Sequence, residues 1–240
     1  RVVERGDFTL GKELKTFEEC WARYVGVNHA IGVNSGTDAL ILVLKALGIR
    51  GEVLVPAFSF VASAATVPLA GAQLRFVDVG EDFNIDVDKL EARITPATEA
   101  IMPVHWAGRA CEMTTIQKIA KDHSLVILED ACHAIGASFR QQQCGSFGNA
   151  AAFSLHPLKN VNAWGDGGVI TTNNDQLAAK LRNIRNHGLS DRNTCQQWAH
   201  NSRLDTVQAV VANHVLKKLD YIIRRRRENA AALDILLANI

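Results

Sequence analysis

One lysine, Lys159, stands where its amine could form an imine with a carbonyl compound. It follows the apolar run Phe153-Ser154-Leu155-His156-Pro157-Leu158 and precedes the turn Gly165-Asp166-Gly167-Gly168. Upstream, Leu125-Val126-Ile127-Leu128-Glu129-Asp130 is an apolar segment that ends in carboxylates. A lysine amine and an aspartate that holds a pyridinium nitrogen are the minimal protein groups for pyridoxal phosphate (PLP) chemistry. Most lysines are solvated surface groups, so the argument rests on what surrounds this one.

A second group of residues could bind a phosphate. Ser35-Gly36-Thr37 lies between a predicted strand and a predicted helix. Gly36 would let the backbone approach an anion, Thr37 or Asp38 would offer amide hydrogens, and the helix dipole favours negative charge. Taken by itself, this motif is better explained as an ordinary helix N-cap, which Ser and Thr often supply.

Two further polar residues follow predicted strands. Asp130 would need a partner if it is buried, and a protonated pyridine nitrogen is a good one, although an N-cap or a salt bridge would also serve. Ser154 could donate to a phosphate or form a turn. In an open α/β sheet, ligands bind beyond the carboxyl ends of the strands. Gly36, Asp130, Ser154 and Lys159 all occur at or just past such ends, and this order favours a common site.

Three histidines and one phenylalanine are weaker candidates. His133 follows Asp130 and could touch the cofactor oxygen or its ring face, although a lone histidine is more often structural. His105 ends a predicted strand and is a candidate substrate-side residue. His187 is a second one, although a contact at a helix C-terminus is the preferred interpretation. Phe60 could stack on a planar cofactor, although a core aromatic is the default.

Hydrophobic spacing predicts strands that alternate with helices. The predicted strands are 30–33, 52–55, 73–77, 100–105, 125–128, 150–155 and 168–172. The predicted helices are 14–24, 38–47, 61–70, 86–93, 113–122, 176–185 and a long one at 205–238. This alternation indicates a three-layer α/β fold with a mostly parallel sheet flanked by helices. We assign 1–210 to one large domain and 211–240 to the long helix.

Composition excludes several classes of protein. A net charge of +1 gives no global electrostatic reason to expect nucleic acid or an acidic membrane as partner. No apolar stretch reaches the length needed to span a bilayer, and the start lacks a signal-peptide pattern. The five cysteines are scattered without a CxxC pair, which fits reduced thiols in a cytoplasmic protein. We assign no metal ligands.

Taken together, the motifs resemble the DegT/DnrJ/EryC1/StrS family over nearly the whole chain. These proteins are PLP-dependent sugar aminotransferases, mostly acting on nucleotide sugars, with the aspartate aminotransferase fold (fold type I). The motifs that carry the resemblance are Ser35-Gly36-Thr37-Asp38-Ala39-Leu40, Pro56-Ala57-Phe58-Ser59-Phe60-Val61-Ala62, Pro103-Val104-His105, Glu129-Asp130-Ala131-Cys132-His133-Ala134 and Ser154-Leu155-His156-Pro157-Leu158-Lys159-Asn160.

The resemblance assigns a role to each candidate. Lys159 would form the imine with PLP and move the proton between cofactor and substrate carbons. Asp130 would pair with the pyridine nitrogen and keep it protonated. The other cofactor contacts that the resemblance implies are the phosphate ligands Thr37, Asp38 and Ser154, the ring-stacking Phe60, and His133 beside the cofactor oxygen.

The resemblance also implies a partner subunit and a reaction. Asn201 would reach the phosphate bound by the neighbouring subunit, so we expect a homodimer with shared active sites. Many relatives have an aromatic residue at Ser202, and the Asn-Ser-Arg-Leu-Asp version seen here resembles members that aminate C3 of a 3-keto nucleotide sugar. Glutamate would convert PLP to pyridoxamine phosphate (PMP), and a keto sugar, usually on a nucleoside diphosphate, would then accept the amine.

Departures from the family pattern leave alternatives open. Many relatives have Pro-Thr before the lysine where this chain has His156-Pro157-Leu158, which admits a keto-sugar acid without a nucleotide as acceptor. The chain starts with Arg1 and ends within a helical pattern, so we expect a piece of a longer protein without its C-terminal small domain. A PLP-binding or regulatory fragment without turnover therefore remains an alternative.

Two other classes fit less well. The sugar dehydratase branch of the family has histidine at the lysine position, so Lys159 argues against it. A Rossmann dehydrogenase would need GxGxxG after the first strand, which Gly32 to Gly36 does not supply. The run Arg224-Arg225-Arg226-Arg227 wraps around a helix and is interpreted as a solvated stretch.

Overall fold

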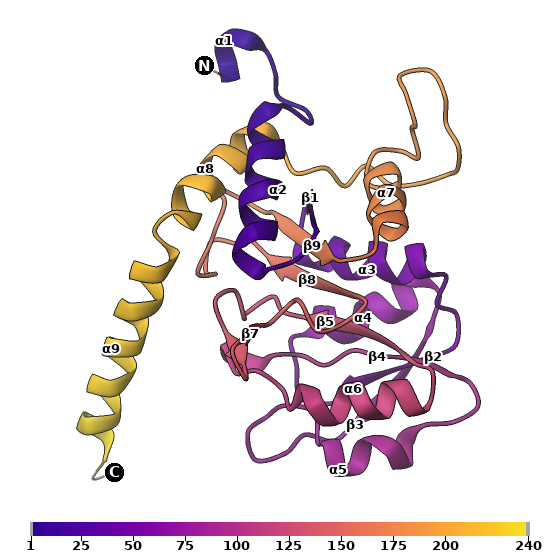
Figure 1. The fold of residues 1–240 in the computed structure, drawn as a ribbon, viewed down its shortest axis with the longest axis vertical. Helices are drawn as coiled ribbons and strands as arrows, with labels where there is room; N and C mark the ends of the chain where they lie inside the picture. Colours follow the sequence, from indigo (N-terminus) through magenta and orange to yellow (C-terminus); the bar gives the residue numbers. More distant parts are fainter. Residues whose placement is uncertain (1, 239–240) are drawn as a thin grey trace.

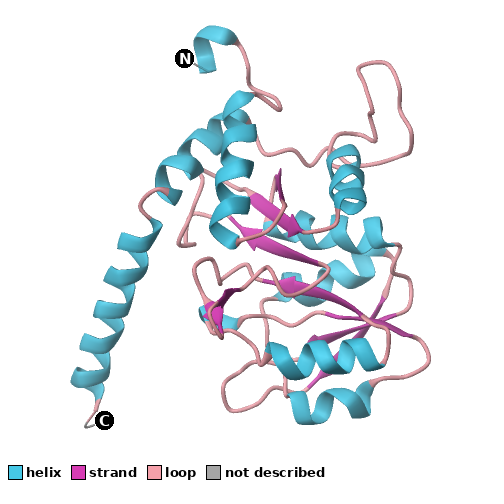
Figure 2. Cartoon of the chain, viewed as in Figure 1, coloured by secondary structure: helices cyan, strands magenta, loops and turns pink. Residues whose placement is uncertain are grey.

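A seven-stranded sheet forms the centre of the molecule (Figures 1 and 2). The computed structural model describes residues 2–238, so the outermost positions of the predicted 1–210 and 211–240 segments lie outside the described residues. The strands of this sheet are β1 (His29–Val33), β2 (Glu52–Pro56), β3 (Gln73–Val77), β4 (Thr98–Ile101), β5 (Val126–Asp130), β8 (Ala150–Ser154) and β9 (Gly168–Thr172).

The strand order is β1-β9-β8-β5-β4-β2-β3. β9 pairs antiparallel with both β1 and β8, and every other pairing in this sheet is parallel. The predicted mostly parallel sheet is therefore confirmed. Because β1, β2, β4, β5 and β8 run in the same direction, their carboxyl ends meet at one edge, where ligands bind in such sheets.

Helices cover both faces of the sheet, which confirms the three layers. Alternate residues of each strand face opposite sides, and apart from the edge strand β3 both sides are mostly apolar and buried, as expected for a buried parallel sheet. One side packs against α3 (Gly36–Leu47), α4 (Val61–Ala70) and α7 (Asp175–Ile184). The other side packs against α2 (Lys12–Val25), α5 (Val87–Leu90), α6 (Met113–Asp122) and α8 (Thr206–Leu216).

The long C-terminal helix predicted for 205–238 is wrong as a single element. The chain forms α8 and then α9 (Leu219–Leu237), and Lys218 between them has non-helical φ −104° and ψ 2°. The buried positions of α8 pack into the core, whereas α9 buries only Leu219 among its described residues. The chain therefore turns away from the sheet where its buried stripe ends (Figure 1).

Three smaller features also differ from the prediction. The strand expected at 100–105 ends at Ile101, because Pro103 has no N–H for the ladder, and pairing resumes only as a bridge between Val104 and Asp130. A hairpin, β6 (Ser138–Phe139) and β7 (Gln142–Gln143), was not predicted, because its turn residues Arg140 and Gln141 carry positive φ without glycine. The N-terminal helix α1 (Val2–Arg5) was also missed.

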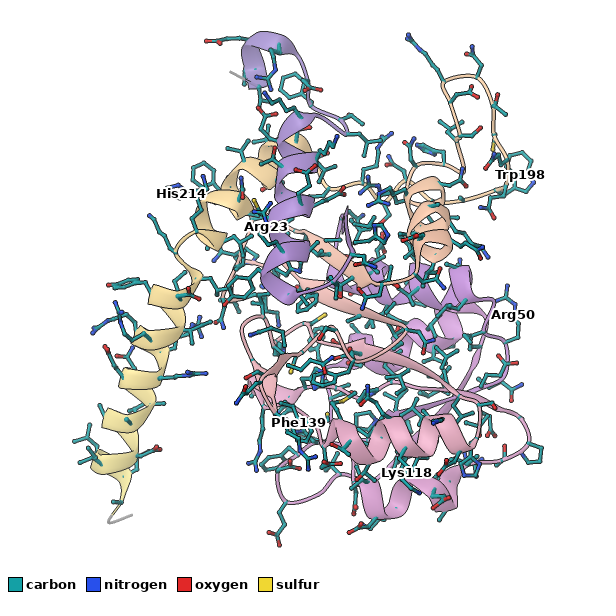
Figure 3. The ribbon with its side chains drawn as sticks, in the orientation of Figure 1. Arg23, Arg50, Lys118, Phe139, Trp198 and His214 are labelled. Atoms are coloured by element: carbon teal, nitrogen blue, oxygen red, sulfur yellow. The ribbon has the colours of Figure 1, made fainter. Side chains whose placement is uncertain are left out.

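Two segments extend from the core. The loop between α7 and α8 projects from the body, and its Trp198 is almost fully exposed (Figure 3). α9 runs along one side of the molecule and exposes apolar side chains, including Tyr221, Leu233 and Ile235. Within residues 2–238, no helix combines the length and apolarity that crossing a bilayer requires.

Candidate active site

A cavity of about 330 Å³ opens at the carboxyl edge of the sheet. It collects residues from the ends of β1, β5 and β8, together with the start of α4. Most of the predicted cofactor contacts line this cavity, which agrees with the common site expected from the sequence. The predicted residues in its lining are Gly36, Thr37, Phe60, Asp130, His133, Ser154 and Lys159.

The N-terminus of α3 forms one wall of the cavity. A side chain at Gly36 would place a Cβ 2.8 Å from Cys132 Sγ and 3.0 Å from the Ser154 Cβ, so glycine is needed for this approach. Helix geometry leaves the first backbone N–H groups, those of Gly36 and Thr37, without intrahelical acceptors. These N–H groups and the helix dipole suit a phosphate.

Asp38 is not brought into this wall. Its backbone N–H donates to Ser35 Oγ at 3.0 Å, so the N-cap that the sequence also allowed is present. Asp38 is absent from the residues that line the cavity. The predicted phosphate contact through the Asp38 amide therefore has no support in this geometry, because that N–H is already engaged.

Asp130 is the buried acid of the cavity. It is the last residue of β5, and only 4% of its surface is exposed. Its Oδ2 accepts a hydrogen bond from Ser63 Oγ at 2.7 Å, and its Oδ1 accepts one from the Cys132 backbone N–H at 3.1 Å. Ser63 was missed in the sequence, although a polar residue in the apolar segment Val61–Ala70 is a signal that could have drawn attention to it.

Lys159 lies in the loop after β8 and is half-buried. Burial lowers the pKa of its amine below the ordinary value of 10.5, while Cys132 and Asp130 act in the opposite direction. A lowered pKa increases the fraction of neutral amine near pH 7, which is the nucleophilic form. Burial, together with Asp130, raises the pKa of the Cys132 thiol, so this cysteine stays protonated.

His133 lines the cavity beside Lys159. Burial lowers the pKa of its imidazole, the nearby Lys159 amine lowers it further, and Asp130 partly opposes both. The ring of Trp106 contacts the His133 ring edge-on, with centroids 5.4 Å apart, and Phe58 packs on Trp106 in the same way at 5.0 Å. His133 is therefore held as a neutral ring that can contact a planar ligand.

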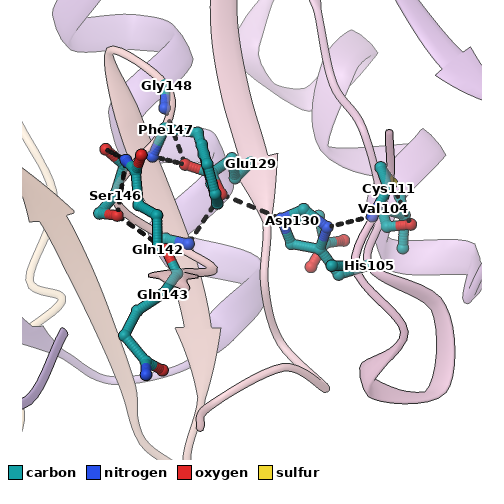
Figure 4. A network of polar contacts seen from close by, with 12 residues as sticks. Val104, His105, Cys111, Glu129, Asp130, Gln142, Gln143, Ser146, Phe147 and Gly148 are labelled. Atoms are coloured by element: carbon teal, nitrogen blue, oxygen red, sulfur yellow. Dashed lines mark hydrogen bonds and ion pairs between the residues drawn. The ribbon is translucent and has the colours of Figure 1, made fainter. Parts of the chain in front are cut away.

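His105, which the sequence suggests as a substrate-side residue, does not line the cavity. Its side chain is fully buried, with Nε2 2.9 Å from Glu129 Oε2 (Figure 4). Its Nδ1 accepts the backbone N–H of Cys111 at 3.1 Å. Val104 still lines the cavity, but the His105 ring lies in the core, where both of its ring nitrogens have partners.

Glu129 is the centre of this buried network (Figure 4). Besides His105, it accepts the backbone N–H groups of Gly145, Phe147 and Gly148 at 2.7–2.8 Å. These bonds tie β5 to the segment that leads into β8. The network therefore holds the two strands that carry Asp130 and Ser154.

Replacing Glu129 with alanine is expected to lower the free energy of unfolding by about 3 kcal/mol, because two buried and two partly buried donors lose their acceptor. Urea unfolding followed by circular dichroism measures this change. Glu91→Ala is the matched control: Glu91 pairs with His123 at 3.1 Å, but its side chain is 66% exposed, and its removal should cost less than about 1 kcal/mol. Equal losses in both variants would contradict a structural role for the network.

His187 and Asn201 lie away from the cavity. His187 is exposed after α7, has φ +57°, and donates its backbone N–H to the His200 carbonyl at 2.8 Å. This bond joins the segment after α7 to the segment before α8, and His187 does not line the cavity. Asn201 forms a bridge with Asn186 and does not line the cavity of its own chain.

A second cavity of about 520 Å³ adjoins the first and shares Lys159, His133, Cys132 and Leu158 with it. Its far wall comes from α9 and includes Arg226 and Arg227. Among its lining residues are three basic side chains and no carboxylate. Arg224 and Arg225 instead pair with Glu228 on the exposed side of α9. These two arginines therefore fit the prediction of a solvated stretch, whereas Arg226 and Arg227 line the cavity.

The sequence profile of the DegT/DnrJ/EryC1/StrS aminotransferase family matches residues 1–240. The chain belongs to this family. The resemblance inferred from the motifs is thereby confirmed, and with it PLP as the cofactor that the DegT/DnrJ/EryC1/StrS aminotransferases use.

Three similar proteins illustrate the relationship. A UDP-N-acetyl-3-dehydro-alpha-D-glucosamine 3-aminotransferase from Acidithiobacillus ferrooxidans is 42% identical over 214 residues, which is 88% of this chain and 58% of that protein. DesV of Streptomyces venezuelae, solved with a ketimine intermediate, is 41% identical with a TM-score of 0.89, over 92% of this chain and 60% of that one. NtdA of Bacillus subtilis, solved with bound PMP, is 35% identical with a TM-score of 0.86, over 91% of this chain and 51% of that one.

The chain spans 58% to 68% of the length of the curated DegT/DnrJ/EryC1/StrS relatives that it matches. The residues present nevertheless fit PLP. The cavity offers a buried carboxylate for the ring nitrogen, an amine with a lowered pKa for the aldehyde carbon, and a helix N-terminus for the phosphate. These three groups come from the end of β5, the loop after β8 and the start of α3, and all of them line one cavity.

Proposed function

We propose that this chain carries the cofactor site of a PLP-dependent aminotransferase that moves an amino group from glutamate to a keto sugar. The observation that carries the proposal is the meeting of Lys159 and Asp130 in one cavity at the N-terminus of α3. Each group alone has a structural explanation, but their combination is the one that amine transfer through PLP requires.

Bound PLP would supply an electron sink for the carbon that gains or loses the amine. Lys159 would hold the aldehyde carbon and then, once released, carry the proton between the reacting carbons as base and acid. Asp130 would hold a proton on the ring nitrogen. The N–H groups of Gly36 and Thr37 and the hydroxyl of Ser154 would orient the phosphate, and Phe60 and His133 would contact the ring.

We propose a nucleoside-diphosphate sugar as the acceptor, aminated at C3. The relative from A. ferrooxidans is named for a 3-dehydro sugar linked to UDP, and it supports both parts of this proposal. The basic lining of the second cavity also favours an anionic acceptor, since Lys159, Arg226 and Arg227 face it without a carboxylate. A free keto-sugar acid also carries a negative charge that these basic side chains would attract, and it is the second candidate acceptor.

We also propose that two copies complete the site. Phe60 and Leu158 line the cavity and yet are largely exposed, and Trp164 is exposed two residues before the lining Asp166. Large exposed apolar side chains at the rim of a cavity are typical of a surface that a partner covers. Asn201, which does not reach its own cavity, would then serve the cavity of the partner subunit.

The five cysteines are free thiols in the structure, which supports a reducing compartment such as the cytoplasm.

The visible absorption spectrum of the purified protein with PLP, before and after glutamate, tests the function. The proposal expects a band typical of a lysine-bound cofactor that glutamate converts to the PMP form. A band that glutamate leaves unchanged would favour the alternative of a PLP-binding fragment without turnover. A folded sample that gives no band would overturn the assignment of Lys159.

The rate at which this band forms after addition of PLP should rise with pH and level off below pH 10.5. Only the neutral amine attacks the aldehyde, and burial lowers the pKa of Lys159 from its ordinary value of 10.5, so the neutral form predominates earlier. Stopped-flow absorbance across pH measures the plateau. Nα-acetyl-lysine with PLP is the control, and a protein plateau at the same pH as this free amine would contradict the lowered pKa.

A further inference from the structure

The hydroxyl of Ser63 is used in an unusual way for a residue in the first turn of a helix. Serine there commonly bonds to its own helix end, but Phe60 is the N-cap of α4 and no side chain caps this helix. Ser63 Oγ instead donates to Asp130 Oδ2 at 2.7 Å, across 67 positions of sequence. Only 2% of the Ser63 surface is exposed, so water does not compete for this bond.

The hydrogen bonds of Asp130 fix the plane of its carboxylate. Ser63 occupies Oδ2, and the Cys132 backbone N–H occupies Oδ1 at 3.1 Å. A carboxylate has about four lone-pair sites, so one donor on each oxygen leaves sites for a further donor from the cavity. Ser63 and Asp130 both line that cavity, so a ligand bound there would lie beside this carboxylate.

We propose that Ser63 is a positioning residue that holds the Asp130 carboxylate toward the ring nitrogen of PLP. This inference rests on the proposed function and adds a residue to it. The Cys132 N–H is a backbone donor and remains in any variant, so Ser63 is the side chain that decides the orientation of Oδ2. Its charge-assisted bond also stabilises the negative charge on which the ring proton depends.

The same helix supplies a matched control. Thr66 lies one turn after Ser63, is fully buried, and donates its hydroxyl to the Ser63 carbonyl at 3.0 Å. Thr66→Val removes a buried hydroxyl from α4 without touching Asp130. A merely structural role for Ser63 would therefore make Ser63→Ala and Thr66→Val behave alike.

The experiment compares wild type, Ser63→Ala, Ser63→Thr and Thr66→Val after loading with PLP. The readout is the pH midpoint of the visible band of the bound cofactor, with the PLP dissociation constant as a second measurement. A protonated ring nitrogen withdraws electrons and lowers the pH midpoint of the band. If the Asp130 carboxylate is no longer aligned with the ring nitrogen, that nitrogen holds its proton less well, and the midpoint should rise. Ser63→Ala is expected to raise the midpoint by about one pH unit and the dissociation constant about tenfold, the size of one lost bond to a charged group.

The outcomes separate this inference from the proposed function. Ser63→Thr keeps a hydroxyl and should retain the wild-type midpoint, as should Thr66→Val, even if both melt at lower temperature. A midpoint in Ser63→Ala equal to that of Thr66→Val would overturn the positioning role while leaving the proposed function intact. A wild-type protein without a visible band would overturn the proposed function and this inference together. Should Ser63→Ala not fold, a shifted midpoint in Ser63→Cys, whose thiol is a weak donor, supports the proposal, and an unshifted one overturns it.

Discussion

Replacing Lys159 with alanine is expected to abolish the band of the lysine-bound cofactor and to slow the conversion by glutamate at least about 10³-fold. The variant loses both the amine that holds the aldehyde carbon and the base that moves the proton. Because Lys159 lies in a loop and is only half-buried, the fold should be unaffected. Single-turnover absorbance with glutamate measures the rate, and circular dichroism checks the fold.

Lys118→Ala is the control for this prediction. Lys118 lies on the outer face of α6, where it pairs with Asp122 at 3.0 Å, and its side chain is largely exposed (Figure 3). Lys118→Ala also removes one lysine amine, but at a position away from the cavity. If Lys159→Ala and Lys118→Ala retain the same band and rate, the assignment of the reactive lysine is incorrect.

The site residues that the sequence could predict are those at or just after the carboxyl ends of parallel strands. Asp130 and Ser154 directly end apolar segments, and parallel strands bring such ends to one edge whatever the details of packing. Gly36 and Lys159 follow strands closely and so arrive at the same edge. The three-layer architecture was predictable for the same reason, because alternating strands and helices leave few other arrangements.

The parts that sequence could not predict depend on how elements face one another. Ser63 reaches Asp130 only because α4 turns one particular side toward β5, and nothing in the local pattern gives that rotation. The apolar run before His105 predicts a strand that ends at this histidine, but Pro103 interrupts the ladder earlier and the His105 ring lies in the core. The break at Lys218 lacks proline or glycine. It depends on α8 packing against the core along its length, whereas α9 packs against the core only near its start, through Leu219 and Ile223.

Replacing Asp130 with asparagine is expected to slow the conversion by glutamate about 10³-fold, while PLP still binds and gives a band. Asparagine preserves the shape of the side chain, and Lys159 and the start of α3 remain. What disappears is the negative charge beside the ring nitrogen. Without that charge the ring is a poorer electron acceptor at the step where a proton leaves carbon, so the loss should appear in the rate and not mainly in glutamate binding.

A PLP analogue methylated at the ring nitrogen distinguishes this explanation from general damage to the site. The methyl group fixes the positive charge that Asp130 would otherwise maintain, so the analogue should restore part of the rate in Asp130→Asn and none in Lys159→Ala. Asp122→Asn, which changes an exposed aspartate of α6, should leave the rate with PLP unchanged. A full rate in Asp130→Asn with ordinary PLP would show that this buried carboxylate only supports the fold, and its bond to Ser63 would then be structural as well.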